Sequence, residues 1–302
     1  MEALLSTCPS AEPKSGPGTK PEPQYILKLS CAAAPGIVAA VTTALAEQGA
    51  NLVETAQFWD RQSNRFFLRV AFLASADDEG RIFDALAPIK ARFEMEMILS
   101  HTGRKPRILI MVSRFDHALL HLLYQVRVGW LDAEVVGIVS NHPDARRVAE
   151  QERLPFHHIP VTRDSKPEAE ARLLALVEDV DADLVVLARY MQVLSDEMSR
   201  ALSGRVINIH HSFLPSFKGA KPYHQAHERG VKLIGATAHY VTADLDEGPI
   251  IEQEAERVAH SMTPDDLVAV GRDIESRVLA RAVKMHLEGR VMLNGQRTVV
   301  FN

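Results

Sequence analysis

Asn208 and His210 are polar residues placed where a buried strand is expected to end. They close the apolar segment RVINIHH, residues 205–211, where unused polar groups would be costly to bury. Residues two apart in a strand project from one face, so these two side chains can address the same atom while His211 points to the other face. An amide N–H beside an imidazole N–H suits an oxygen that becomes negative when a carbonyl is attacked. The alternative is a pair of polar groups satisfied within the core.

A base for that chemistry lies further along the chain, in HYVTADLDEGPIIEQ, residues 239–253. Its Asp-Glu-Gly-Pro sequence is typical of an ordinary surface turn. A carboxylate on a turn between two strands could also reach the strand end, where Asp246 would take a proton from the nucleophile or orient and charge the histidine. We therefore expect Asn208, His210 and Asp246 to form one site.

The elements that must position these residues alternate between apolar strands and helices after residue 106. Uniformly apolar strands separated by helices favour a doubly wound, mostly parallel α/β sheet, because such strands are covered on both faces. Ligands bind such sheets at the carboxyl ends of the strands, where Asn208 and His210 lie. We expect strands at 107–113, 133–140, 155–161, 182–188 and 205–211, and helices at 116–126, 144–152, 167–180 and 194–202.

The N-terminal part of the chain has a different pattern. Residues 1–23 contain five prolines among Gly, Ser and Lys, which predicts a disordered tail. Residues 24–101 indicate strand, helix, two strands, helix and strand, a ferredoxin-like order in which one face of an antiparallel sheet carries both helices. The polar connector HTGRKP, residues 101–106, marks the boundary with a second domain at residues 102–302.

The first domain resembles a known regulatory module. Residues 34–54, APGIVAAVTTALAEQGANLVE, resemble the opening of an ACT domain, which often binds amino acids and usually pairs with another copy. Gly36 follows the proline of the motif and would allow a tight turn into the helix. Ala33 stands where many relatives carry an acidic residue. The resemblance implies an ACT-like regulatory domain over residues 24–101, a possible amino-acid effector and a homo-oligomer.

The second domain resembles the folate-dependent formyltransferase family over residues 208–253. Its doubled histidine and the segment PYHQAHERGVK resemble the members that hydrolyse the formyl donor. The resemblance implies that 10-formyltetrahydrofolate is hydrolysed to formate and tetrahydrofolate, which supplies formate for purine biosynthesis and balances one-carbon pools. It implies Asn208, His210 and Asp246 as the catalytic residues. The implied pterin pocket is lined by two segments, Met191, Gln192, Val193 and Leu194 in the first and Thr242, Ala243, Asp244 and Leu245 in the second.

Two other functions are open at this point. A formyltransferase would pass the formyl group to a small amine such as glycinamide ribonucleotide, and such relatives resemble one another in a Gly- and Asn-rich loop that cradles a phosphate after the first strand. Here RFDH, residues 114–117, follows that strand without glycine, which favours water as the acceptor. The other function is an amino-acid-sensing regulatory protein with a degenerate catalytic domain, which the retention of Asn208, His210 and Asp246 disfavours.

Composition limits the partners. A net charge of -5 at pH 7 provides no basic field for nucleic acid or an anionic membrane, and no apolar run is long enough to cross a bilayer. With two cysteines, neither a disulfide framework nor a Cys-based zinc site is expected, and we expect a cytoplasmic enzyme without cofactor or metal. His117 and His121 could form one edge of a metal site but lack a third ligand of suitable spacing. Lys218 and Lys221 are candidates to meet the acidic tail of a folate.

Overall fold

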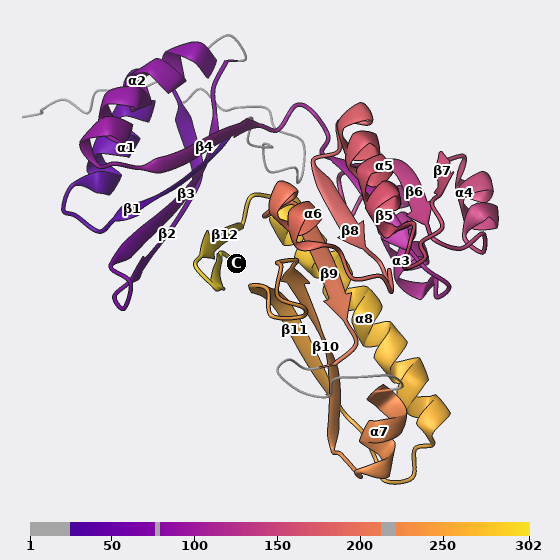
Figure 1. The fold of residues 1–302 in the computed structure, drawn as a ribbon. Helices are drawn as coiled ribbons and strands as arrows, with labels where there is room; N and C mark the ends of the chain where they lie inside the picture. The colour runs from indigo at the N-terminus through magenta and orange to yellow at the C-terminus, as the bar shows by residue number, and fades with distance from the viewer. Residues whose placement is uncertain (1–24, 76–78, 213–221) are drawn as a thin grey trace, which may run out of the picture.

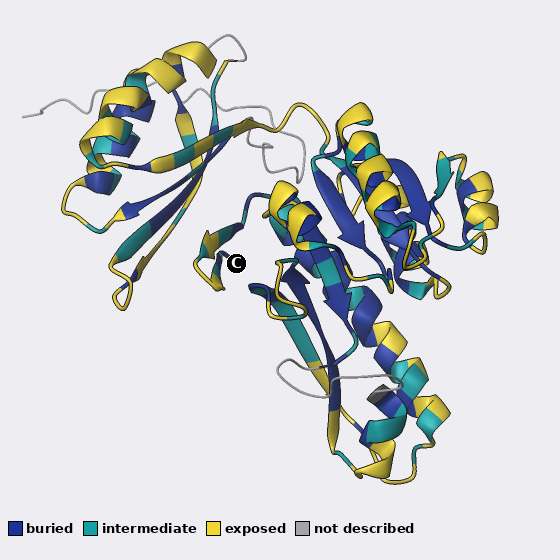
Figure 2. Cartoon of the chain, viewed as in Figure 1, coloured by how far each residue is buried: buried dark blue, intermediate teal, exposed yellow. Residues whose placement is uncertain are grey.

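The computed structural model describes residues 25–75, 79–212 and 222–302, which form two sheet-based units (Figure 1). The tail expected at 1–23 lies outside the described residues, as do Lys218 and Lys221. Buried residues concentrate along the strands and on the helix faces that cover them (Figure 2). Within the described ranges, no helix combines the length and the apolar composition that a membrane span requires.

The first unit is a four-stranded antiparallel sheet in the order β2-β3-β1-β4. Its elements are β1 (Tyr25–Ala32), α1 (Ile37–Glu47), β2 (Asn51–Asp60), β3 (Arg65–Leu73), α2 (Glu79–Arg92) and β4 (Glu96–His101). Both helices pack against the sheet in one apolar cluster that includes Leu27, Val41 and Leu86. Gly36 precedes α1 with a φ of 87°, a left-handed conformation that glycine adopts without strain. The ferredoxin-like order predicted from the sequence is confirmed.

The second unit is a seven-stranded sheet in the order β11-β10-β9-β8-β5-β6-β7. Neighbouring strands from β5 to β9 are parallel, whereas β10 and β11 are antiparallel to their neighbours. Its elements are β5 (Arg107–Val112), α3 (His117–Arg127), β6 (Glu134–Ser140), α4 (Arg146–Glu152), β7 (Phe156–His158), α5 (Lys166–Asp179), β8 (Leu184–Leu187), α6 (Asp196–Ala201), β9 (Val206–His210), α7 (Pro222–Glu228), β10 (Leu233–Tyr240), β11 (Ile250–Arg257) and α8 (Pro264–Leu287). The doubly wound, mostly parallel sheet predicted from the sequence is confirmed.

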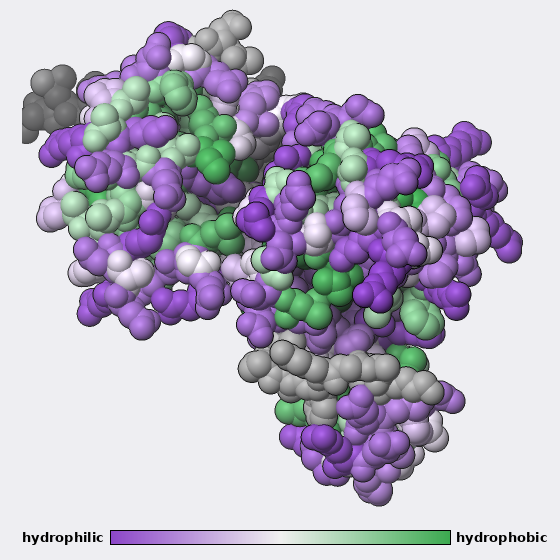
Figure 3. Space-filling model, viewed as in Figure 1, coloured by the Kyte–Doolittle hydropathy of each residue, from purple (hydrophilic) through white to green (hydrophobic). Residues whose placement is uncertain are grey.

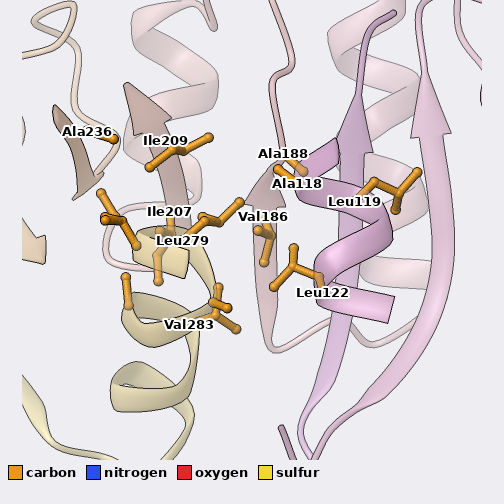
Figure 4. Packing of buried hydrophobic residues seen from close by; sticks show 14 of the residues in the cluster. Ala118, Leu119, Leu122, Val186, Ala188, Ile207, Ile209, Ala236, Leu279 and Val283 are labelled. Atoms are coloured by element: carbon orange, nitrogen blue, oxygen red, sulfur yellow. The ribbon is translucent and has the colours of Figure 1, made fainter. Parts of the chain in front are cut away.

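Alternate residues of β9 belong to opposite faces of this sheet. Ile207 and Ile209 lie in the buried apolar cluster that contains Leu279 of α8, and Figure 4 shows this packing. Because side chains alternate along a strand, Asn208 and His210 project from the other face. The packing of α8 on one side of the sheet therefore decides which side receives the polar residues.

A C-terminal hairpin joins the two units. Its strands are β12 (Val291–Asn294) and β13 (Arg297–Val300), which pair with each other. Val299 and Phe301 pack on Phe67 of β3. Arg69, also in β3, donates hydrogen bonds from Nε and Nη2 to the backbone carbonyl of Glu288. The first sheet is thus held against the end of α8, the helix that covers β9 and β10.

Candidate active site

Asn208 in β9 lies directly opposite His239 of the antiparallel strand β10. Its Nδ2 atom lies 3.2 Å from His239 Nε2. His239 Nδ1 lies 2.9 Å from the Tyr240 backbone carbonyl, which is an acceptor, so Nδ1 carries the proton and Nε2 accepts from the amide. Burial lowers the pKa of His239 and keeps this ring neutral. The pairing fixes the Asn208 amide and leaves its second N–H for the pocket.

His210 ends β9 and meets Asp246, which lies in the loop between β10 and β11. His210 Nδ1 and Asp246 Oδ1 are 3.2 Å apart. The hydrogen bond from His210 lowers the pKa of Asp246, so its carboxylate is ionised at neutral pH. Asp246 Oδ1 also lies 3.8 Å from His239 Nε2. The structure therefore brings Asn208, His210 and Asp246 together.

The turn that carries Asp246 is built closely against β10. Asp246 has a φ of 57°, a left-handed conformation that Asp tolerates better than most residues. Gly248 lies so near the strand that a Cβ there would be 1.7 Å from the Tyr240 carbonyl oxygen and 3.2 Å from His239 Nδ1. The Tyr240 N–H donates to the Pro249 carbonyl over 3.0 Å. The Asp-Glu-Gly-Pro segment is therefore a turn that packs directly against β10 beside the site.

These residues line a pocket of about 230 Å³ at the carboxyl ends of β8 and β9. Both segments expected to hold a pterin also line it, namely Met191, Gln192, Val193 and Leu194 after β8 and Thr242, Ala243, Asp244 and Leu245 after β10. Large apolar side chains at its edge are more than half exposed, at 55% for Met191, 51% for Val193 and 59% for Leu245. Figure 3 shows hydrophobic residues exposed among hydrophilic ones on the visible face of the molecule. An apolar rim around a few polar groups suits a flat ring system.

His210 Nε2 is buried and has no hydrogen-bond partner within the part of the chain that the structure describes. Since Nδ1 faces the Asp246 carboxylate, Nε2 is a donor when the ring is protonated on both nitrogens. This N–H and the second N–H of Asn208 form a pair of donors on one face of β9. Such a pair can stabilise a carbonyl oxygen that becomes negative. The sequence left open that His210 is a core histidine whose ring nitrogens are both hydrogen-bonded. Its Nε2 has no such partner among the described residues.

A buried ionic cluster adjoins the pocket on the side of α8. Glu275 of α8, 1% exposed, has Oε2 at 2.8 Å from His117 Nε2 and at 3.4 Å from Arg189 Nε. Its Oε1 accepts a hydrogen bond of 2.7 Å from the Tyr223 hydroxyl. Burial alone would raise the pKa of Glu275, but the His117 hydrogen bond and the Arg189 charge outweigh it, and the pKa is lowered. Both oxygens of the buried Glu275 carboxylate therefore have partners within the chain.

His117 Nε2 contacts Glu275, and His121 Nε2 lies 3.2 Å from Gln125 Nε2, so each of the two histidines has a partner within the chain. Among the described residues, no group of three or more His, Cys, Asp or Glu side chains is arranged to hold a metal ion.

Sequence reasoning missed His239, Arg189 and His211 as pocket residues. A signal existed for His239, because it is a histidine within the apolar segment IGATAHYVT, residues 234–242. Arg189 gave a weaker signal as a charged residue directly after an apolar strand. His239 faces the pocket through the pairing of β10 with β9, which the sequence does not specify. His211 was expected on the other face of the strand, but it lies beyond the end of β9, where strand alternation no longer decides the direction of a side chain.

Comparison with known proteins gives a consistent result. A family profile described as formyl transferase matches residues 106–283. A formyltetrahydrofolate deformylase of Corynebacterium sp. (strain P-1) is 53% identical over 281 residues, covering 92% of this chain and 98% of the relative. The crystal structure of a formyltetrahydrofolate deformylase from Burkholderia mallei ATCC 23344 is 54% identical with a TM-score of 0.89, covering 93% of this chain and 100% of that chain.

A glycinamide ribonucleotide transformylase 1 from Symbiobacterium toebii is a more distant structural neighbour. It is 31% identical with a TM-score of 0.62 and covers 67% of this chain and 97% of its own. The likeness to the deformylases therefore extends over nearly the whole chain, whereas the likeness to this transformylase extends over two thirds of it.

Proposed function

Because the chain belongs to the formyl transferase family and matches its formyltetrahydrofolate deformylases over nearly its full length, we propose that it hydrolyses 10-formyltetrahydrofolate to formate and tetrahydrofolate. The single observation that carries this proposal is the meeting of Asn208, His210 and Asp246 in one pocket, with His210 Nδ1 at 3.2 Å from Asp246 Oδ1. The reaction supplies formate for purine biosynthesis and balances one-carbon pools.

Asn208 and His210 stabilise the negative oxygen of the tetrahedral intermediate. When water attacks the N10-formyl carbon, the carbonyl oxygen becomes an oxyanion that needs donors already in place. Asn208 donates its second Nδ2–H, which the bond to His239 directs, and His210 donates Nε2–H. Losing one such donor from an oxyanion site typically costs a factor of about 100 to 1,000 in rate.

Asp246 orients the His210 ring through its contact with Nδ1. The carboxylate accepts the Nδ1–H of His210 and stays ionised because its pKa is lowered. A carboxylate at this place also helps to move protons between the attacking water and the leaving amine. In the balanced reaction the water oxygen bonds to the formyl carbon, the carbon–N10 bond breaks, and one water proton ends on N10.

The folate ring lies in the apolar part of the pocket. We assign its walls to Met191, Gln192, Val193 and Leu194 on one side and to Thr242, Ala243, Asp244 and Leu245 on the other, which all line the same cavity as the three polar residues. The exposed apolar side chains at the rim lose water contact when the ring binds, which favours binding. No cofactor or metal is expected beyond the folate substrate.

The first unit is proposed to be an ACT-like regulatory domain of residues 24–101, and residues 102–302 the catalytic domain. Separate sheets and a separate apolar cluster support this division. We also expect a homo-oligomer in the cytoplasm and an amino-acid effector at the first domain. Large apolar side chains exposed on this domain support self-association, namely Val53, Phe58 and Trp59 of β2 and Ile98 of β4.

The proposed function is tested with purified protein, 10-formyltetrahydrofolate and no amine acceptor. Tetrahydrofolate is followed by absorbance, and formate is quantified separately. We expect one formate for each tetrahydrofolate. Turnover that needs glycinamide ribonucleotide would contradict hydrolysis and make the chain a transferase, while ligand binding without turnover in either assay would favour a sensing role.

A further inference from the structure

His211 is a pocket residue with a buried ring nitrogen. It follows His210 directly, and the two ring centroids are 4.7 Å apart with an angle of 47° between the ring planes. Its Nδ1 atom is buried and lacks a hydrogen-bond partner among the described residues, although the residue lines the pocket. A buried polar atom without a partner costs about 1–3 kcal/mol unless water or a ligand satisfies it. The position therefore points to a small polar molecule beside this ring.

The surroundings of His211 keep its ring neutral. Burial lowers the pKa of His211 to about 4, with further lowering by the charges of Arg189 and His210, and the opposing charges of Glu275 and Asp246 do not cancel this. A neutral imidazole carries one N–H and one lone pair. A lone pair that stays free at neutral pH can accept a hydrogen from a water molecule while the oxygen of that water attacks a carbon.

The carboxylate of the cluster behind His211 is engaged by neighbouring side chains. Glu275 Oε1 is engaged by Tyr223, and Oε2 lies next to both His117 and Arg189. Removing one partner from such a buried ion pair would leave an uncompensated charge, which is strongly destabilising. The Glu275 carboxylate is thus committed to Tyr223 and His117, whereas His211 Nδ1, like Arg189 Nε, has no hydrogen-bond partner among the described residues.

We propose that His211 holds the water that attacks the formyl group, with Nδ1 accepting one hydrogen of that water. This inference rests on the proposed function. The water oxygen forms the new bond to the formyl carbon, and the carbon–N10 bond breaks. The proton that leaves the water ends on N10, and the remaining hydroxyl hydrogen is lost to solvent as formic acid ionises to formate.

The test compares His211→Leu with His211→Asn in the full-length protein. Leu fills the space without an acceptor, whereas the Asn amide oxygen can take the place of Nδ1. We expect His211→Leu to lower kcat for formate release about 100-fold with KM changed less than about threefold, and His211→Asn to stay within about tenfold of wild type. His157→Leu is the matched control, since His157 in β7 also has a buried nitrogen without a partner in the described ranges but lies at the far edge of the sheet.

Hydroxylamine separates a role in water attack from a role in the fold. It is a strong nucleophile that needs no water-holding residue, so formyl transfer to hydroxylamine by His211→Leu should stay within about fivefold of wild type. Equal losses with water and hydroxylamine would overturn the proposal, as would hydrolysis by His211→Leu at the wild-type rate.

If His211→Leu does not fold, His211→Ala with added imidazole replaces it. Restored hydrolysis supports the proposal, and its absence contradicts it. Failure of wild type to release formate would instead contradict the proposed function.

Discussion

His210 and Asp246, which are 36 positions apart in the chain, meet at 3.2 Å between Nδ1 and Oδ1 because β10 returns antiparallel to β9. The turn after β10 is thereby delivered to the carboxyl end of β9. The Asp246 carboxylate holds Nδ1 of His210 and leaves Nε2 for the substrate. One contact between the end of β9 and the turn after β10 thus sets the direction of the proposed oxyanion donor.

Replacing His210 removes one of the two proposed donors. We expect His210→Ala to lower kcat at least about 30-fold, which corresponds to about 2 kcal/mol of transition-state stabilisation, with little change in KM. Steady-state kinetics with 10-formyltetrahydrofolate measures both constants. His158→Ala, a half-buried histidine in the edge strand β7, serves as the control and should behave as wild type. A change confined to KM would assign His210 to binding instead.

His239 should act through Asn208. Without its Nε2 acceptor the amide loses its fixed direction, so we expect His239→Leu to lower kcat about tenfold, in line with the loss of one hydrogen bond. A double-mutant cycle with Asn208→Ala measures this dependence. Once Asn208 is Ala, the His239 change should add little to the loss. Fully additive losses would show that His239 acts independently of the amide.

Gly248 should be required for the position of Asp246. A Cβ at 1.7 Å from the Tyr240 carbonyl oxygen forces the turn away from β10, and a shift of about 1 Å in a reacting group can cost about 100-fold in rate. We therefore expect Gly248→Ala to fold and to lose about 100-fold in kcat. Gly80→Ala is the control because a Cβ there meets no atom within 4 Å. Wild-type kcat in Gly248→Ala would contradict the close fit of the turn.

Glu275 should stabilise the fold in a pH-dependent way. Glu275→Gln leaves Arg189 and His117 without their buried carboxylate, so we expect the free energy of unfolding at pH 7 to fall by about 3–5 kcal/mol. The pKa of Glu275 is lowered in the folded protein, so its contribution is complete above the unfolded value of about 4.3 and is lost as pH falls through the folded value. Urea denaturation at several pH values measures the difference, which should shrink below pH of about 4.3. A difference that grows on acidification would contradict the ionised state of Glu275.

The sequence was informative where a local pattern decides the structure. Uniform apolar strands and helical spacing predicted both sheets, and the two-residue spacing of Asn208 and His210 predicted their common face. The structure shortens the strand expected at 155–161 to Phe156–His158, because it is an edge strand with prolines at both flanks. The two segments that the resemblance implies as pterin-binding both line the pocket.

Tertiary pairing explains what local patterns could not provide. His239 reaches Asn208 through the register of β10 on β9, and Glu275 reaches Arg189 through the packing of α8. Neither register nor helix packing is encoded in the spacing of the residues involved. A buried polar residue in an apolar segment signals that a partner exists but does not identify it.

The most direct test of the account is the hydrolytic kcat of Asp246→Asn. The substitution is nearly isosteric and removes the charge, so the fold and tetrahydrofolate binding should be retained while kcat falls by about 100-fold or more. Glu247→Gln, which removes the next and exposed carboxylate of the same turn, should keep wild-type activity. Formate release by a folded Asp246→Asn at a rate near that of wild type would contradict the proposed mechanism.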